Sequence, residues 1–357
     1  MRISELDGLR GWAALSVVLF HVFWETFGVT IPTYRSLFVS GFINGQTAVT
    51  VFFLVSGAAL SAPYHLGKSR DYLISATVRR HLRLAIPIFA AATIVYMLFH
   101  FGLMRGPEAS VFVNREDWRG LNWAADVTFQ NIFYFSFAGV FVGSPPQYEI
   151  IPFLWTMTIE FSGSALLFLA LFCREQMQNP RSFFRVVACF LLLTLPNLSC
   201  FFLGSLLIER RLKRERSKIA DHQIFALSSI LALYVFSCLA LRYKIPYGEQ
   251  LRTIFCTLFF YQALNFEQLR RFLGENAWSI FLGKISFPIF LIHFAVIGSF
   301  TAPLIIRFHD HLGPKTSFAI GITTAAIAIL AALAFLPLER FGHDISKKFV
   351  KLVLKGE

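Results

Sequence analysis

Two ionisable residues inside apolar stretches are the first candidates for chemistry. His21 closes the apolar run GWAALSVVLFH, and Glu160 interrupts the apolar run from Ile151 to Cys173. Because the unperturbed pKa of histidine is ~6.5, its side chain can act as a general base near neutral pH. A carboxylate beside the ring would orient it and stabilise its protonated form. A His21–Glu160 pair is therefore one hypothesis; the alternatives, left open by the residues alone, are a helix-packing histidine and an ion pair of Glu160 with another span.

Helix geometry predicts how deep these groups lie in a bilayer. Asp7 and Arg10 precede the apolar run, and an α-helix carries His21 about 16 Å along its axis from Arg10. Because the hydrocarbon core is about 30 Å thick, Arg10 would lie at one interface and His21 near the midplane. By the same rise, Glu160 reaches a similar depth in its own span. Ionisable groups at this depth are costly, which indicates function.

Two arginines in the segment VRRHLRLAIP form a candidate anion site. Arg80 and Arg83 share one face of a helix if this segment is helical. A guanidinium binds phosphate oxygens in a bidentate fork, so the pair suits phosphate groups. The alternative, which the residues alone favour, is ordinary anchoring on anionic lipid.

The segment LGKISFPIFLIH contributes Ser286 and a second intramembrane histidine, His293. Ser286 could line a pocket or bond back to its own helix. His21 and His293 could bind a metal, but two histidines without further ligands are a weak pattern, and we expect no metal. The five cysteines show no CxxC spacing, which favours small buried apolar residues over a metal site or disulfide framework.

The loop 105–126 combines carboxylates with two tryptophans, Trp118 and Trp123. Aromatic faces stack on sugar rings, and acids accept hydroxyl protons, so this composition is compatible with sugar recognition. The alternative, which we favour slightly, is a solvated loop with an aromatic belt at the membrane interface.

Composition predicts the elements that must position these residues. The chain has 357 residues, 56% of them hydrophobic and 42 of them phenylalanine, which is too apolar for a soluble protein of this size. A net charge of +12 is compatible with nucleic-acid binding, but cytoplasmic anchoring of membrane helices explains it better. We expect an all-α, polytopic helical membrane protein without a nucleic-acid partner.

Uncharged runs predict about ten transmembrane helices in a single domain, residues 1–357, with a short basic cytoplasmic tail at about 339–357. Pro196 lies inside the sixth run and either kinks one span or divides it, which would make eleven. The ten predicted spans are Gly11–Trp24, Gln46–Ala62, Leu84–Met104, Val127–Gly143, Ile151–Cys173, Val186–Ile208, Gln223–Leu241, Thr253–Phe266, Ile280–Ile306 and Thr316–Leu338.

The distribution of Lys and Arg favours ten spans with both termini in the cytoplasm. In this arrangement the inner segments carry about twice as many Lys and Arg residues as the outer ones, as positive-inside orientation requires. Eleven spans would place either the basic segment 209–221 or the C-terminal cluster outside. The ten-span arrangement places Arg174 and Arg181 outside and segment 209–221 inside.

Five blocks, in order, resemble signature segments of the acyltransferase 3 family, membrane-bound O-acyltransferases that modify polysaccharides and related glycans. Several positions depart from the family pattern: Thr50 and Phe161 stand where acids are frequent, and Phe287 and Phe290 replace tyrosines. The blocks run from residue 6 to residue 293 and read LDGLRGWAALSVVLFH, VTVFFLVSG, VRRHLRLAIP, FLWTMTIEF and LGKISFPIFLIH.

The resemblance implies a role for each candidate residue. His21, oriented by Glu160, acts on an acceptor hydroxyl as a general base or receives the acyl group briefly. The phosphates of acyl-CoA are implied to meet Arg10, Arg80 and Arg83. Residues of the same blocks that would line the pocket are Asp7, Ser56, Trp155, Ser286 and His293.

The resemblance also implies the substrates and the location. Acyl-CoA, expected to be acetyl-CoA, is a co-substrate rather than a bound cofactor, and the acceptor is a glycan, exopolysaccharide or lipid-linked saccharide. The protein is expected in the cell (inner or plasma) membrane. A transporter or flippase is the main alternative, because broken segments and midplane ionisable residues also occur there. A non-catalytic scaffold is a third possibility.

Overall fold

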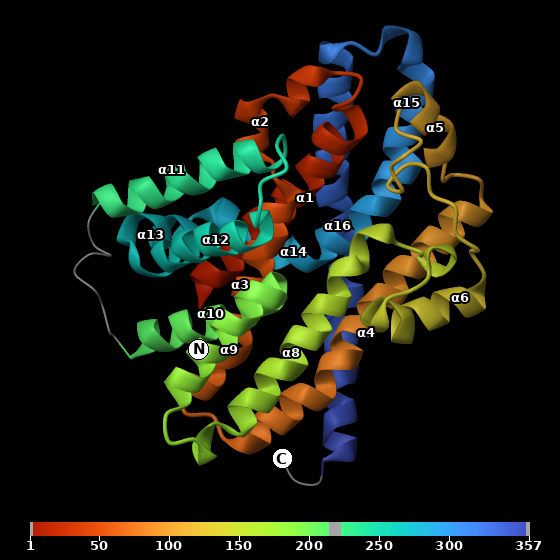
Figure 1. Ribbon diagram of the computed structural model, residues 1–357. Helices are drawn as coiled ribbons and strands as arrows, with labels where there is room; N and C mark the ends of the chain where they lie inside the picture. The colour runs from red at the N-terminus through yellow and green to blue at the C-terminus, as the bar shows by residue number, and fades with distance from the viewer. Residues whose placement is uncertain (1–2, 214–222, 355–357) are drawn as a thin grey trace. The chain divides into compact units, whose positions relative to one another are not determined.

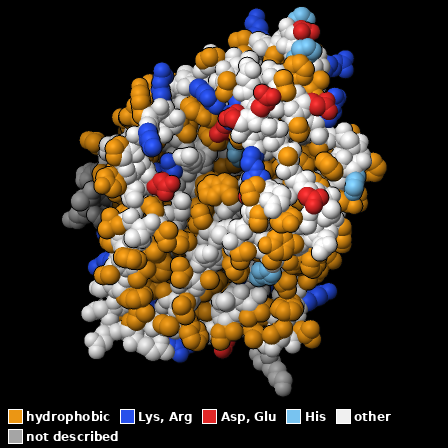
Figure 2. Space-filling view, turned by 45° about the vertical axis from the view of Figure 1, so that its right-hand side comes forward, with side chains coloured by type: hydrophobic (Ala, Val, Ile, Leu, Met, Phe, Trp, Pro, Cys, Tyr) orange, Lys and Arg blue, Asp and Glu red, His pale blue; other side chains and the backbone are white. Residues whose placement is uncertain are grey.

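The computed structural model describes residues 3–213 and 223–354, and every regular element in these ranges is a helix (Figure 1). Within these ranges, seven helical segments are long and apolar enough to cross a membrane. This confirms an all-α, multi-pass membrane protein. Large hydrophobic side chains such as Phe38, Leu169 and Leu330 are exposed, and hydrophobic side chains cover much of the face drawn in Figure 2. The seven segments are Ser4–Phe27, Leu37–His65, Arg70–His100, Pro152–Phe172, Gln223–Ala240, Ala277–His311 and Pro314–Val353.

Two of the predicted spans are parts of longer helices. The basic segment before Leu84 is helical and belongs to α4 (Arg70–His100), and α16 (Pro314–Val353) continues through most of the predicted basic tail. Residues 214–222 of the basic segment and 355–357 of the tail lie outside the described residues. The number of spans and the orientation of the termini stay predictions.

At two other predicted spans, the helices found are too short or not apolar enough to count among the seven segments. The predicted span Val127–Gly143 folds as α6 (Phe129–Tyr134), η3 (Phe135–Gly139) and α7 (Val140–Val142), which together are shorter than the roughly 20 residues that a crossing needs. The span predicted at Thr253–Phe266 corresponds to α12 (Gly248–Asn265), which is not among the seven apolar segments.

The predicted single span Val186–Ile208 is wrong. It folds as two helices, α9 (Pro180–Thr194) and α10 (Pro196–Leu212), which pack against each other. Pro196 is the first residue of α10, and Leu195 before it has a non-helical backbone (φ −139°, ψ 70°), as a residue preceding proline prefers. Arg181 Nε lies 3.1 Å from Glu209 Oε1, so the start of α9 meets the end of α10.

Helices drawn from three stretches of the chain form a first compact unit, made of the described residues of 1–14, 40–77 and 159–286. In it α10 packs on α3 (Gly45–His65), and α11 (Gln223–Ala240) packs on α12. Gly57 and Gly204 face the partner backbone so closely that an added Cβ would clash. The amphipathic helix α13 (Glu267–Glu275) follows α12.

The second unit comprises 15–39, 78–158 and the described residues of 287–357. Here α5 (Gly106–Phe112) packs on α15 (Ala302–Phe308), and α16 packs on two π-helices, η1 (Phe20–Phe27) and η8 (Ile297–Thr301). The boundaries between the units fall within α1 (Ser4–Leu19), α2 (Leu37–Phe42), α4, α8 (Thr156–Phe172) and α14 (Ala277–Val296). The remaining short helices are η2 (Pro32–Arg35), η4 (Pro146–Tyr148), η5 (Pro152–Trp155), η6 (Arg174–Gln176) and η9 (His309–His311).

Candidate active site

His21 and His293 form a hydrogen-bonded pair inside the second unit. His21 Nδ1 lies 2.9 Å from His293 Nε2, and the planes of the two rings are nearly parallel, with an interplanar angle of 10°. His293 Nδ1 lies 3.0 Å from the carbonyl oxygen of Ile289. His293 is fully buried, whereas His21 is only half-buried and can be reached from outside the protein. The two predicted histidines are therefore brought together, and His21 is the more exposed member of the pair.

His21 owes its position to the π-helix η1, which begins one residue before it. A π-turn leaves backbone groups poorly paired and is frequent at functional sites. Here Thr26 Oγ1 donates a hydrogen bond to the carbonyl oxygen of His21 at 2.8 Å, which satisfies that carbonyl within the π-helix.

An aromatic column holds the two imidazole rings. Phe153 stacks on His21 with ring centroids 3.9 Å apart and on His293 at 4.8 Å. The ring centroid of Trp118 lies 5.9 Å from the ring centroids of both Phe153 and His21. Sequence reasoning did not select Phe153, although it lies in the block FLWTMTIEF beside Trp155 and two residues after the apolar run begins.

A buried arginine, Arg115, connects the loop 105–126 to the π-helix η1 that carries His21. Arg115 is 4% exposed and forms ion pairs with Glu25 and Asp117, each at 2.8 Å, and its guanidinium lies 5.3 Å from the centre of the Trp118 ring. The hydrogen bond from Arg115 lowers the pKa of the Asp117 carboxyl. Trp123 is buried and donates to the carbonyl oxygen of Glu149. Neither a sugar platform nor an interfacial belt describes Trp123, because it packs inside the protein.

In the first unit, two other predicted residues, Asp7 and Ser286, contact Arg10. Arg10 Nε donates to Ser286 Oγ at 2.8 Å, and Arg10 Nη2 lies 3.4 Å from Asp7 Oδ1. The Arg10 side chain remains one-third exposed. Gly11 permits this arrangement, because a Cβ there would clash with the backbone of Gly283 on α14.

The remaining predicted residues lie in both units. Glu160, on α8, is buried and Ser56, on α3, is half-buried; both belong to the first unit. The second unit contains the other three: on α4, Arg80 is half-buried and Arg83 is exposed, and on η5, Trp155 is 52% exposed. Because Glu160 and His21 belong to different units, their pairing stays a prediction, as do the phosphate contacts of Arg80 and Arg83. Within the described ranges, no three His, Cys, Asp or Glu side chains gather closely enough to hold a metal ion.

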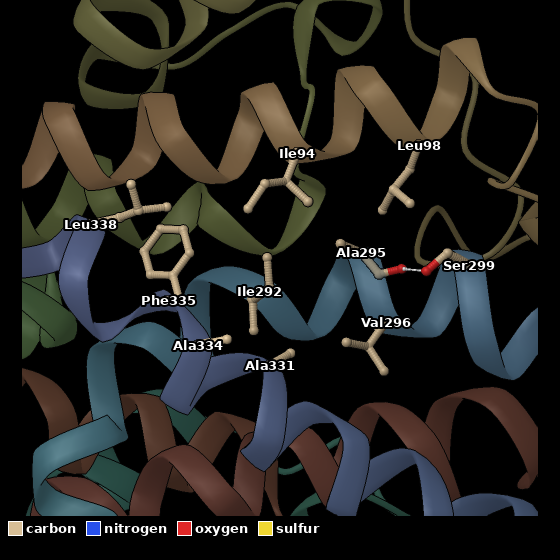
Figure 3. A pocket seen from close by; sticks show the side chains of 10 residues that line it. All are labelled: Ile94, Leu98, Ile292, Ala295, Val296, Ser299, Ala331, Ala334, Phe335 and Leu338. Carbon is tan, nitrogen blue, oxygen red and sulfur yellow. Dashed lines mark hydrogen bonds between the residues drawn. The ribbon is translucent and has the colours of Figure 1, made fainter.

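The second unit also contains an apolar pocket of about 300 Å³ between α4, α14 and α16. Figure 3 shows side chains from the three helices pointing into the same space, with Ser299 hydrogen-bonded to the carbonyl oxygen of Ala295. None of the lining side chains is ionisable, so this pocket cannot perform acid–base chemistry. Neither His21 nor His293 lines it.

The fold and the histidine pair define a multi-pass membrane protein with an ionisable site inside its helices. The acyltransferase 3 family, described as an acyltransferase domain, matches residues 3–337, so the chain belongs to this family and is an acyltransferase. The O-acetyltransferase PaAT-1 of Phomopsis amygdali is 25% identical, in an alignment that covers 99% of this chain and 86% of that protein. No solved structure is significantly similar to the chain.

Proposed function

We propose that this acyltransferase moves an acyl group, acetyl in the first instance, from cytoplasmic acyl-CoA to a hydroxyl of a glycan, exopolysaccharide or lipid-linked saccharide. The observation that carries the proposal is the pairing of an accessible histidine, His21, with a fully buried one, His293. The similarity to a protein named as an O-acetyltransferase supports a hydroxyl acceptor and an acetyl group. Membership of an acyltransferase family argues against the transporter and scaffold alternatives.

In the proposed reaction His21 is the general base. Its free ring nitrogen takes the proton of the acceptor hydroxyl while that oxygen attacks the thioester carbon. The carbon–sulfur bond then breaks, and the CoA thiolate recovers the proton from His21. Glu160 is proposed to stabilise the protonated ring electrostatically. No cofactor is needed, because acyl-CoA supplies the activated acyl group.

The donor is proposed to bind through arginines on the cytoplasmic side of the cell membrane. Arg10 is already oriented by Ser286 and Asp7, and its partial exposure leaves its remaining N–H donors available for a phosphate. Arg80 and Arg83 would contact other phosphates of the same molecule. The N-terminal end of α1, which carries Arg10, would then face the cytoplasm.

The variant His21→Ala tests the proposed base. We expect acyl transfer from acetyl-CoA, measured as thiol release and labelled product in purified membranes, to fall by about 100-fold or more, because general-base catalysis contributes 10²–10⁴-fold. The matched control is His309→Ala, an exposed histidine on η9, which should keep wild-type activity. Full activity in His21→Ala, in protein that unfolds at the wild-type temperature, would refute the assignment.

The acceptor class has its own test. Mass spectrometry of cell-envelope glycans, with and without the gene, should show an acyl mass increment on hydroxyl groups that depends on His21. Envelope glycans that are identical in the two strains would remove glycans as acceptors while leaving acyl transfer itself intact.

A further inference from the structure

We infer that His293 is a positioning residue that holds His21 in the one tautomer able to act as a base and shares the proton that His21 takes up. The inference rests on the proposed role of His21 as the base. It assigns His293 a place in the reaction that composition and spacing did not give it.

The hydrogen-bond donors can be counted from the buried end of the pair. The carbonyl oxygen of Ile289 can only accept, so His293 Nδ1 must carry the hydrogen of their 3.0 Å bond. In a neutral imidazole the other nitrogen then has a lone pair, so His293 Nε2 is an acceptor. His21 Nδ1 lies 2.9 Å away and must donate to it. The lone pair of His21 is therefore on Nε2, the nitrogen that a base needs free.

Packing makes this the only available arrangement for His293. The ring is fully buried, so no water can replace the carbonyl of Ile289 or the ring of His21 as a partner. Phe153 stacks on both imidazoles, which prevents either ring from turning over. A flipped or differently protonated His293 would bury an unpaired polar nitrogen, which is unfavourable.

The same hydrogen bond provides a route for the proton during reaction. When His21 Nε2 takes the proton of the acceptor hydroxyl, the Nδ1 hydrogen of His21 can move to His293 Nε2. His293 is then an imidazolium whose two N–H groups face His21 and Ile289, and every donor in the chain keeps an acceptor. When the CoA thiolate takes the proton from His21 Nε2, the Nδ1 hydrogen returns to His21, so no net proton is gained or lost.

Three variants at His293 separate this role from simple space filling. Gln places its amide oxygen near the position of Nε2 and can accept from His21 Nδ1. Asn is also polar but places its amide near the position of Nδ1, too far back to reach His21. Leu fills similar volume without an acceptor. Only His293→Gln therefore preserves the acceptor that selects the His21 tautomer.

We expect kcat of His293→Gln to stay within about 10-fold of wild type, and kcat of His293→Asn and His293→Leu to fall by about 100-fold or more, as tautomer loss does in other base dyads. KM for acetyl-CoA should change by less than about twofold, because His293 does not touch the donor phosphates in the proposed reaction. Adding His293→Leu to His21→Ala should cause no further loss, since residues that act as a unit are not additive. Thermal unfolding of each variant is measured alongside.

The outcomes are distinct from those for the proposed function. If His21→Ala is inactive but His293→Gln is no better than His293→Asn, the positioning role is wrong and the general-base proposal survives. Activities that follow the unfolding temperatures of the three variants would also overturn it, because they would make His293 a packing residue. Active His21→Ala would instead overturn the proposed function.

Discussion

At the scale of single residues, Arg10 shows how a predicted ligand contact depends on a second residue. Its Nε is held by Ser286 and its Nη2 by Asp7, so the guanidinium is oriented before any donor binds. Pre-organisation lowers the entropy lost on binding. Ser286 therefore belongs to donor binding in our proposal, although Ser286 itself contacts no phosphate.

We predict that Ser286→Ala raises KM for acetyl-CoA by about 10-fold with little change in kcat, because a hydrogen bond to a charged group contributes about 1.5–3 kcal/mol. Initial rates over a range of acetyl-CoA concentrations give both KM and kcat. The matched control is Ser279→Ala, on the same helix, whose hydroxyl accepts a hydrogen bond from Trp12 rather than Arg10. An unchanged KM in Ser286→Ala would show that Arg10 does not depend on Ser286.

At the scale of elements, close backbone contacts place the ionisable side chains. The first helix can approach α14 near Arg10 because Gly11 and Gly283 have no side chain at the contact, and Gly8 lets it approach the backbone of Leu273 on α13. At the other end of its segment, the π-helix η1 sets the direction of His21. The glycines of the LDGLRG stretch are thus explained by packing, and they bring Arg10 within reach of Ser286.

The packing of α9 on α10 also bears on the predicted membrane topology. Glu209 is buried and forms ion pairs with Arg174, Arg181 and Lys213. Arg174, Arg181 and Lys213 therefore meet at one carboxylate, whereas the ten-span arrangement placed the two arginines and the end of this segment on opposite sides of the membrane.

We predict that Gln178→Cys and Lys213→Cys, each introduced into a cysteine-free background, react with an impermeant thiol reagent from the same side of the membrane. Both positions are exposed, and Gln178 is three residues from Arg181, which contacts Glu209. Intact cells and inverted vesicles give the two directions of labelling. Labelling from opposite sides would contradict this prediction and would support one continuous membrane span between residues 178 and 213.

At the scale of the whole molecule, both compact units are assembled from stretches that are far apart in the chain. The first unit contains the Arg10 cluster and Glu160, and the second contains the histidine pair with its aromatic column. Continuous helices, α1 and α14 among them, carry the chain from residues of one unit to residues of the other. The chain has a net charge of +12, and basic residues recur near its C-terminal end.

We predict that a fluorescent reporter fused after residue 357 is cytoplasmic and that a fusion after Gly313, the residue before α16, reports the opposite side. Basic residues at the end of α16 are expected to stay in the cytoplasm. Two reporters, one active only in the cytoplasm and one active only on the opposite side of the membrane, give the location of each fusion. The same location for both would mean that α16 does not cross the membrane.

The sequence by itself determined the class of the protein and most of its helices. A spanning helix must satisfy its backbone internally and cover it with apolar side chains, so segments such as Gln223–Leu241 and Ile151–Cys173 are visible from composition alone. The family blocks identified the acyltransferase, and they selected His21, Arg10, Ser286 and His293 before any contact was known.

Only the tertiary structure decided what these residues touch. A hydrophobic run does not specify how its helix is rotated, so neither the bond from His21 to His293 nor the stacking of Phe153 could be read from spacing. Pro196 gives the same local signal whether it kinks one helix or separates two, and the packing of α9 on α10 resolved it. The reason is common to all three cases: local sequence determines secondary structure and burial, whereas partners distant in the chain are selected by how whole helices pack.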